Sequence, residues 1–267
     1  MRKLTLGLLS VMSLSTFAAG PEIQNVSKGN LERVANEFAV NFSHTVVAAP
    51  ETEGVWGVEV GLVAGRTNSP ALSDVVDEAG EDGGNFRSIY HAGLMSRVHF
   101  PFDLFAEIAV LPSREISDVD VESKSGSIGW NAGGFFGLPL DLAIGLSASN
   151  AEVSFDQAIT SAGVSVDSNI TLEGQSRLLW VAASKRFAFF TPYVKAGFAR
   201  TESKVKVKAA GGIDIFAFSN NQTETVDSTG AYMVLGANAQ LFFMRLGLEF
   251  SRTIGVNKIS GKLSVDF

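Results

Sequence analysis

The chain has 267 residues, of which 46% are hydrophobic and 18% are charged, with 27 glycines, 20 phenylalanines and no cysteine. The missing cysteines exclude a disulfide scaffold, a cysteine-ligated zinc site and a lipid anchor on cysteine. The formal net charge of −7 argues against a nucleic-acid partner, and the apolar content excludes intrinsic disorder.

The N-terminus has the pattern of an export signal. Arg2 and Lys3 precede an apolar stretch from Leu4 to Phe17, which small residues suited to cleavage follow. The stretch is too short and too polar for a spanning helix, so residues 1–19 are predicted to be a secretory signal peptide. No later segment predicts a transmembrane helix. A soluble periplasmic protein, a secreted protein and an outer-membrane barrel remain as the candidate classes.

Residues 20–54 are predicted to form an N-terminal segment with one amphipathic helix over residues 31–42. Leu31, Val34, Phe38 and Phe42 share one face at helical spacing, and Asn30 suits the N-cap. A helix of this length is marginal in water by itself. Its apolar face therefore needs another surface to pack against.

From residue 55 onward the hydrophobic period changes to two, which is typical of strands. The last strand is the clearest, because its apolar face alternates with polar and charged residues. About ten strands are predicted within residues 55–267, at 56–63, 88–100, 102–111, 127–136, 140–147, 171–186, 193–200, 231–241, 244–251 and 259–267.

The connections between these strands alternate in length. Tight turns near 100–103, 137–139, 187–192 and 242–243 alternate with long polar loops at 67–87, 113–126, 150–170 and 201–229. Bulky aromatic residues flank every tight turn, as in the interfacial girdle of an outer-membrane barrel. A soluble β-sandwich is the alternative, but it gives no reason to gather aromatics at alternate turns. The predicted fold is all-β: a transmembrane antiparallel up-and-down β-barrel, preceded by the short helix.

In such a barrel the polar face of the strands lines the lumen. Small barrels are nearly filled by side chains, and mixed charges there would pair, which favours a packed lumen over an ion-selective pore. Inward glycines leave room for the helix, so Leu31, Val34, Phe38 and Phe42 are expected to plug the lumen or lie under its periplasmic mouth. A helix on the inner leaflet of the outer membrane is the alternative. The predicted lumen residues are Glu59, His91, Arg97, Glu107, Arg177, Lys195, Arg245, Glu249 and Lys262.

The alternating final strand that ends in Phe267, behind a signal peptide, resembles the assembly signal of Gram-negative outer-membrane β-barrel proteins. The resemblance covers about residues 55–267. It implies a place in the cell outer membrane, with outer-membrane lipids and lipopolysaccharide as partners. It also implies recognition by the barrel-assembly machinery through Ile259, Gly261, Leu263, Val265 and Phe267.

The sequence gives little sign of catalysis. Of the three histidines, His44 precedes the predicted barrel, and neither His91 nor His99 lies in a pattern that matches omptin-like proteases, outer-membrane phospholipases or lipid A deacylases. A serine–histidine pair formed in three dimensions stays open, with His91 as the first candidate. No glycine-rich phosphate loop and no G-x-S-x-G motif occur. We therefore expect no enzymatic activity, no cofactor and no metal.

One predicted outer loop carries alternating lysines. Lys204, Lys206 and Lys208 are candidate contacts for lipopolysaccharide phosphates, although a solvated charged face explains the same pattern. The sequence favours a structural or surface-interaction barrel with a mostly filled lumen. The alternatives are a narrow channel or transporter for small or hydrophobic solutes with a helical plug, and a barrel hydrolase. The sequence indicates no particular oligomeric state.

Overall fold

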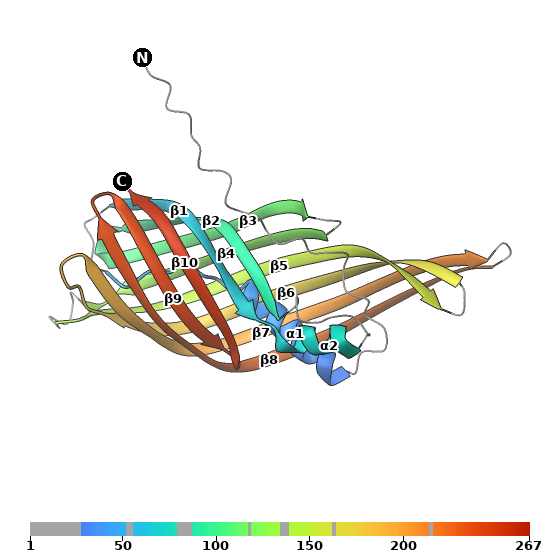
Figure 1. Cartoon of the computed structure of the whole chain (residues 1–267). Coiled ribbons are helices and arrows are strands. Elements are labelled where there is room, and N and C mark those ends of the chain that lie inside the picture. The colour runs from blue at the N-terminus through green and yellow to red at the C-terminus, as the bar shows by residue number, and fades with distance from the viewer. Residues whose placement is uncertain are drawn as a thin grey trace, which may run out of the picture.

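The computed structural model describes residues 28–51, 56–78, 87–116, 119–133, 139–161, 164–213 and 216–267. Ten antiparallel strands close into a barrel, in which each strand pairs with its neighbours in sequence and β1 (Gly57–Asn68) also pairs with β10 (Val256–Asp266). The predicted ten-strand up-and-down barrel is confirmed (Figure 1). The predicted signal peptide, residues 1–19, lies outside the described residues.

Between β1 and β10 run eight further strands, joined by short turns at one end. A helix, α1 (Lys28–Asn41), precedes β1, and a second, α2 (Pro70–Glu78), follows it. The strands are β2 (Ser88–Phe100), β3 (Leu104–Ile116), β4 (Val119–Asn131), β5 (Asp141–Ser161), β6 (Val164–Ser184), β7 (Phe190–Ile213), β8 (Phe216–Leu241) and β9 (Met244–Thr253), with a 3-10 turn, η2 (Pro101–Asp103), after β2.

The long loops predicted at 113–126, 150–170 and 201–229 are wrong, because the structure continues the strands through most of these residues as paired hairpins. Beyond the membrane the outward face of a hairpin meets water instead of lipid, so the apolar outward residues that mark a membrane-spanning strand are missing from the sequence there. The loop predicted at 67–87 also holds α2. There Ser69 precedes Pro70, a residue suited to the first helical position, and the Ser73 N–H donates to the Ser69 carbonyl.

The two ends of the barrel differ. Short turns and the C-terminus lie at one end, and α2 and the longer hairpins lie toward the other (Figure 1). In outer-membrane barrels the short turns face the periplasm, so the end near α2 is the outer end. Phe102 and Phe242 occupy left-handed turn positions with φ of 66° and 57°, where glycine would be less strained. Their side chains are 88% and 95% exposed, as interfacial aromatics are.

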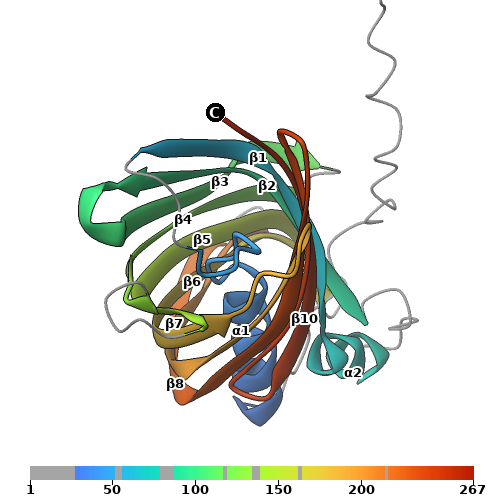
Figure 2. The same cartoon turned by 90° about the vertical axis from the view of Figure 1, so that its left-hand side faces the viewer.

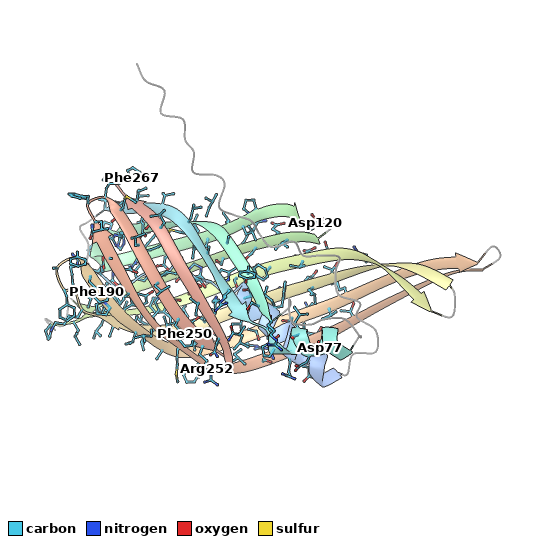
Figure 3. All side chains as sticks on the ribbon, in the orientation of Figure 1. Asp77, Asp120, Phe190, Phe250, Arg252 and Phe267 are labelled. Carbon is cyan, nitrogen blue, oxygen red and sulfur yellow. The ribbon has the colours of Figure 1, made fainter. Side chains whose placement is uncertain are left out.

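The outer face of the wall is apolar over a wide band. Large hydrophobic side chains such as Leu62, Phe198, Leu235 and Leu248 are about half exposed or more. Phe190 and Phe267 lie at the periplasmic end of this band (Figure 3). A closed barrel satisfies its backbone internally, so this band can face lipid. The protein is thus a transmembrane β-barrel of the outer-membrane type.

No helix in the described ranges has the length and apolar character needed to cross a membrane. The helix α1 instead lies within the ring of strands, as the end-on view shows (Figure 2). It is followed by residues 42–51, which form neither helix nor strand and are all buried. We call residues 28–51 the lumen segment. It begins beside α2 at the outer end and reaches the periplasmic end at Glu51, where it contacts the last residues of β6.

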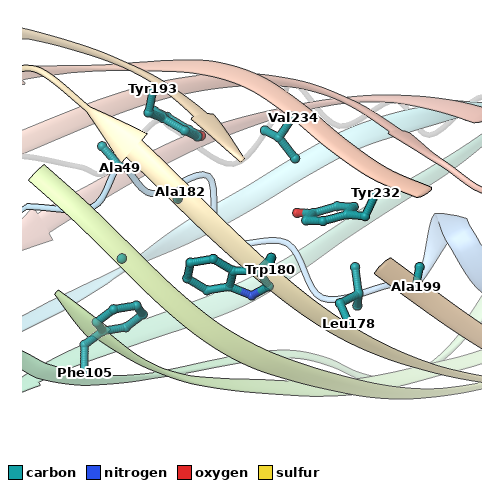
Figure 4. Close-up of a cluster of buried hydrophobic side chains, with 10 residues drawn as sticks. Ala49, Phe105, Leu178, Trp180, Ala182, Tyr193, Ala199, Tyr232 and Val234 are labelled. Carbon is teal, nitrogen blue, oxygen red and sulfur yellow. The ribbon is translucent and has the colours of Figure 1, made fainter. Parts of the chain in front are cut away.

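Aromatic side chains fill much of the remaining lumen. Phe105, Trp180, Tyr193 and Tyr232 belong to one buried cluster (Figure 4). The ring of Trp180 lies over Gly145, where a Cβ atom would come within 2.3 Å of it. The cluster therefore depends on a glycine on the neighbouring strand.

The prediction that Arg177 lines the lumen is wrong, because its side chain points outward and is exposed. In β6 the inward residues include Leu178 and Trp180, and the outward residues include Leu179 and Val181. Both faces of this strand are apolar, so the alternation does not show which face is the lumen side.

We expect replacing Leu263 with Arg to impair membrane assembly. Leu263 is outward-facing in β10 and pairs with Leu62 of β1 and Leu246 of β9. An arginine on the lipid face near the midplane costs about 2–4 kcal/mol. The measurement is the fraction of heat-modifiable, folded protein in outer-membrane preparations. Leu263→Ala is the control, and equal assembly of both variants would contradict a lipid-facing position.

The position of the lumen segment can be tested by disulfide formation. A Cβ atom on Gly247 would approach Val47 Cγ1 to 2.8 Å, so Val47→Cys with Gly247→Cys should crosslink on oxidation. The natural chain has no cysteine to interfere. Leu248→Cys, one residue along on the lipid face, is the matched control. Equal crosslinking of both pairs would show that the segment does not thread the lumen.

Candidate functional site

The lumen segment is tied to the periplasmic end of the wall through Glu51. Its Oε2 accepts hydrogen bonds from Arg186 Nη2 at 3.1 Å and from Arg245 Nη1 at 3.0 Å. Arg245 also donates to Asp266 near the C-terminus, and the Ser184 hydroxyl donates to the carbonyl of the residue before Glu51. A buried charge is costly when unpaired, so these contacts fix where the segment leaves the lumen.

Mid-barrel charges are paired in the same way. Arg97 donates from Nη1 to the Ala49 carbonyl at 3.0 Å, and its guanidinium lies 4.5 Å from the Phe105 ring centroid. Arg97 Nε is 3.6 Å from Glu107 Oε1. Two further ion pairs line the lumen, Lys262 with Glu59 at 2.6 Å and Lys195 with Glu249 at 3.5 Å. Balanced pairs of this kind leave little free charge to select an ion.

The C-terminus of α1 meets a buried ammonium group from β10. Lys258 Nζ donates to the carbonyls of Val40 and Ser43 at 3.2 and 3.1 Å, and to the hydroxyls of Ser43 and Thr45 at 2.8 and 2.6 Å. A helix leaves its last carbonyls without partners and carries a partial negative charge there. Lys258 supplies hydrogen-bond donors to these carbonyls and a positive charge beside the helix end. The sequence prediction does not include Lys258, because its oxygen partners lie more than 200 residues away.

His91 joins the same region to the wall. Its Nδ1 lies 3.0 Å from Asn41 Oδ1, and its Nε2 lies 3.1 Å from Ser260 Oγ. Asn41 Oδ1 also accepts from Thr67, while its Nδ2 donates to the Tyr90 carbonyl. Because the Asn41 oxygen is an acceptor, Nδ1 carries the imidazole proton and Ser260 donates to Nε2. The contact holds α1 against three adjoining strands.

At the outer rim, α1 packs on α2. Val34 lies in a buried cluster with Ala71 and Val75. Glu37 of α1 accepts from the backbone N–H groups of Ala71 at 2.9 Å and Leu72 at 3.1 Å, so it caps the first turn of α2. Burial raises the pKa of the Glu37 carboxyl above its usual range, although the two backbone donors act in the opposite direction.

The residues predicted for the helical plug are placed as follows. Phe38 and Phe42 are buried in one cluster with Ala151, and Phe38 fits against Gly174, where a Cβ would meet its ring at 3.3 Å. Nothing is described of the Leu31 side chain. The helix ends at Asn41 rather than at residue 42, and it lies in the outer half of the lumen rather than under the periplasmic mouth.

Four exposed arginines lie at one level on the lipid-facing surface: Arg66, Arg177, Arg200 and Arg252. Counted along the chain, each arginine lies nine or ten positions from an aromatic residue at the periplasmic end of the barrel. The pairs are Trp56 with Arg66, Phe187 with Arg177, Phe190 with Arg200, and Phe243 with Arg252. A tilted strand of about 9–11 residues spans the membrane. These residues, which we call the arginine belt, therefore lie where the outer headgroups begin.

The predicted lipopolysaccharide contacts lie farther out than this belt. Lys204 pairs with Glu202 at 3.1 Å, and Lys206 pairs with Glu173. The side chain of Lys208 is outside the described set. The lysines thus belong to the water-exposed hairpin of β7 and β8, and acidic neighbours already partner the two whose side chains are described.

A cavity of about 40 Å³ lies beside the C-terminal end of α1, lined by residues that include Asn41, Thr45, His91, Ser123 and Ser125. It has room for two or three water molecules and is far smaller than the usual cofactor pocket. Within the described ranges, no group of three His, Cys, Asp or Glu residues could hold a metal ion.

No protein-family model and no curated protein matches the chain. Several solved structures are similar to this chain at low identity. The translocator domain of the autotransporter NalP from Neisseria meningitidis aligns with a TM-score of 0.41 and 12% identity, over 82% of this chain and 90% of that one. Ail, the attachment invasion locus protein of Yersinia pestis, aligns with 0.31 and 12%, over 81% and 100%. LpxR from Salmonella typhimurium aligns with 0.27 and 9%, over 78% and 99%.

Proposed function

We propose that the protein is a non-conducting outer-membrane barrel that acts at the outer leaflet, where the arginine belt binds lipopolysaccharide phosphates. The observation that carries the proposal is the pairing of Arg177 on β6 with Arg200 on β7. Both side chains are exposed on the lipid side. Like charges directly opposite each other destabilise a sheet, so this pair favours a bound anion.

The surroundings of the pair support this view. Arg200 has Asp227 at 3.2 Å, whereas Arg66, Arg177 and Arg252 have no ion-pair partner among the described residues. The outward positions below the belt on β7, from Phe190 to Phe198, are apolar. An arginine at this height can bind a lipid phosphate bidentately, and the distance to the aromatic end fits the apolar band of a barrel.

The filled lumen supports the absence of conduction. Every residue from Phe38 to Glu51 is buried, and the carboxylate and ammonium groups around the segment are paired. Transport would require the segment to move and to break several of these contacts. The filled lumen therefore favours a role at the outer leaflet over transport through the barrel.

We expect no steady ion conductance from the purified barrel in planar bilayers. Deletion of residues 28–51 should open the lumen and give conductance, because it removes the buried segment. The double variant Glu51→Gln with Lys258→Ala keeps the segment and should give only brief openings. Steady conductance from the unaltered protein would instead favour a narrow channel.

Replacing Arg177 and Arg200 with Ala should weaken lipopolysaccharide binding. Each basic residue near an anionic surface contributes about 1 kcal/mol, so we expect a loss of roughly 2 kcal/mol, or about thirty-fold. The measurement is competition for fluorescent lipopolysaccharide on the detergent-solubilised barrel at low salt. The variant Lys204→Ala with Lys206→Ala is the matched control, and a larger loss in that control would shift the site to the outer hairpins.

A further inference from the structure

His44 of the lumen segment lies between a serine and a carboxylate of the wall. Its Nδ1 is 2.9 Å from Ser125 Oγ on β4, and its Nε2 is 3.2 Å from Glu107 Oε2 on β3. The histidine and the glutamate are almost completely buried. The sequence gives no hint of the grouping, because its members lie at positions 44, 107 and 125 and meet only when the segment is inside the barrel.

The chemistry of the partners fixes the direction of the hydrogen bonds. Arg97 lies 3.6 Å from the other Glu107 oxygen and favours the carboxylate form. A carboxylate only accepts hydrogen bonds, so His44 Nε2 carries the proton that faces it. Nδ1 is then the free base and lies 2.9 Å from the Ser125 hydroxyl, for which the Ala109 carbonyl at 3.3 Å is the other acceptor. A serine hydrogen-bonded to a histidine that a carboxylate orients is the arrangement of an activated nucleophile.

Ser125 is also the member of the group that lines the 40 Å³ cavity. The cavity lies where the wall is incomplete. Pairing between β2 and β3 stops at Leu94 with Val110, although β2 begins at Ser88 and β3 continues to Ile116. Ala92, Gly93 and Leu111, which flank this unpaired stretch, line the cavity as well.

This break lies in the outer half of the barrel. Leu94 is six positions from Phe100 at the periplasmic end, and a full crossing takes about 9–11 residues. The unpaired stretch therefore begins just below the level of the arginine belt. Acyl ester groups of membrane lipids lie beside the headgroups, so they reach this height.

We propose that Ser125, His44 and Glu107 form a serine-hydrolase site for carboxylic esters of outer-leaflet lipids, which enter through the break between β2 and β3. The part of this proposal that rests on the proposed function is that the substrate is a phosphorylated lipid, which the arginine belt would bind. The ester chemistry rests on the three side chains and the cavity, which has room for a carbonyl group and a water molecule.

The reaction has two steps. Ser125 Oγ attacks the ester carbonyl carbon and gives its proton to His44 Nδ1; the ester C–O bond then breaks, and the proton passes to the departing alcohol. Water, the second substrate, attacks the acyl-serine and gives its proton to Nδ1, and that proton returns to Oγ as the free acid leaves. Ser125 and His44 are the catalytic residues, and Glu107 is a positioning residue that holds the His44 tautomer.

The test uses the folded, detergent-solubilised full chain with a short-alkyl fluorophosphonate and with p-nitrophenyl butyrate. We expect covalent labelling at Ser125, located by peptide mass spectrometry, together with ester hydrolysis. Ser125→Ala should abolish both. His44→Gln should slow labelling by about 100-fold or more. Ser127→Ala, which alters an inward-facing serine two positions along β4 that does not line the cavity, is the matched control and should react as the unaltered protein does.

Glu107 needs a readout that a merely structural role would not change. Glu107→Gln should slow labelling and alter its dependence on pH, and Glu107→Asp should restore part of the rate. If Glu107→Gln does not fold, Ser125→Ala still decides the question, because removing one hydroxyl group is a small change to the structure. Absence of labelling at Ser125 from about pH 6 to about pH 9, or an unchanged rate in Ser125→Ala, would overturn the proposal and leave the group as a structural clamp. Both probes are soluble and bypass the arginine belt, so failure of lipid binding in the Arg177 and Arg200 variant would not affect this result.

Discussion

The structure depends on satisfying the polar groups that a closed barrel directs into its lumen. Lipid surrounds the wall, so these groups have only one another, trapped water or the lumen segment as partners. The segment supplies backbone carbonyls to Arg97 and Lys258 and a carboxylate to Arg245. It also brings its own buried groups, and Asn41 and His44 are satisfied by the wall. Segment and wall therefore complement each other, and neither is satisfied alone.

The outer face follows a different rule, because it meets zones of different polarity. Aromatic side chains mark the periplasmic boundary, an apolar band follows, and the arginine belt marks the outer boundary. Beyond the belt, acidic residues such as Glu202 and Asp227 reappear beside basic ones. The change along β7 from apolar outward residues below Arg200 to charged pairs at and beyond it thus indicates where membrane ends and water begins.

The alternation of the strands made the barrel predictable, because lipid outside and a polar lumen inside impose opposite chemistries on the two faces. The same reasoning failed where that contrast fades. In β6 apolar residues fill both faces, so Arg177 was assigned to the wrong side. In the outer hairpins water replaces lipid on the outward face, so the strands there resemble loops. The groupings around Lys258 and His44 could not be predicted, because their members are distant in sequence and meet through the path of the lumen segment.

The contacts of that segment concentrate where the barrel closes. The pairing of β1 with β10 joins residues about 200 positions apart, for example Glu59 with Asp266, and ordering so long a loop carries a large entropic cost. Lys258 of β10 binds the end of α1, and Thr67 of β1 donates to Asn41 of the same helix. At the periplasmic end, Glu51 binds Arg245 of β9, which also binds Asp266. The lumen segment thus links β1 to β10 at the outer end of the seam and binds β9 at the periplasmic end, and it stabilises the closure that creates the lumen it fills.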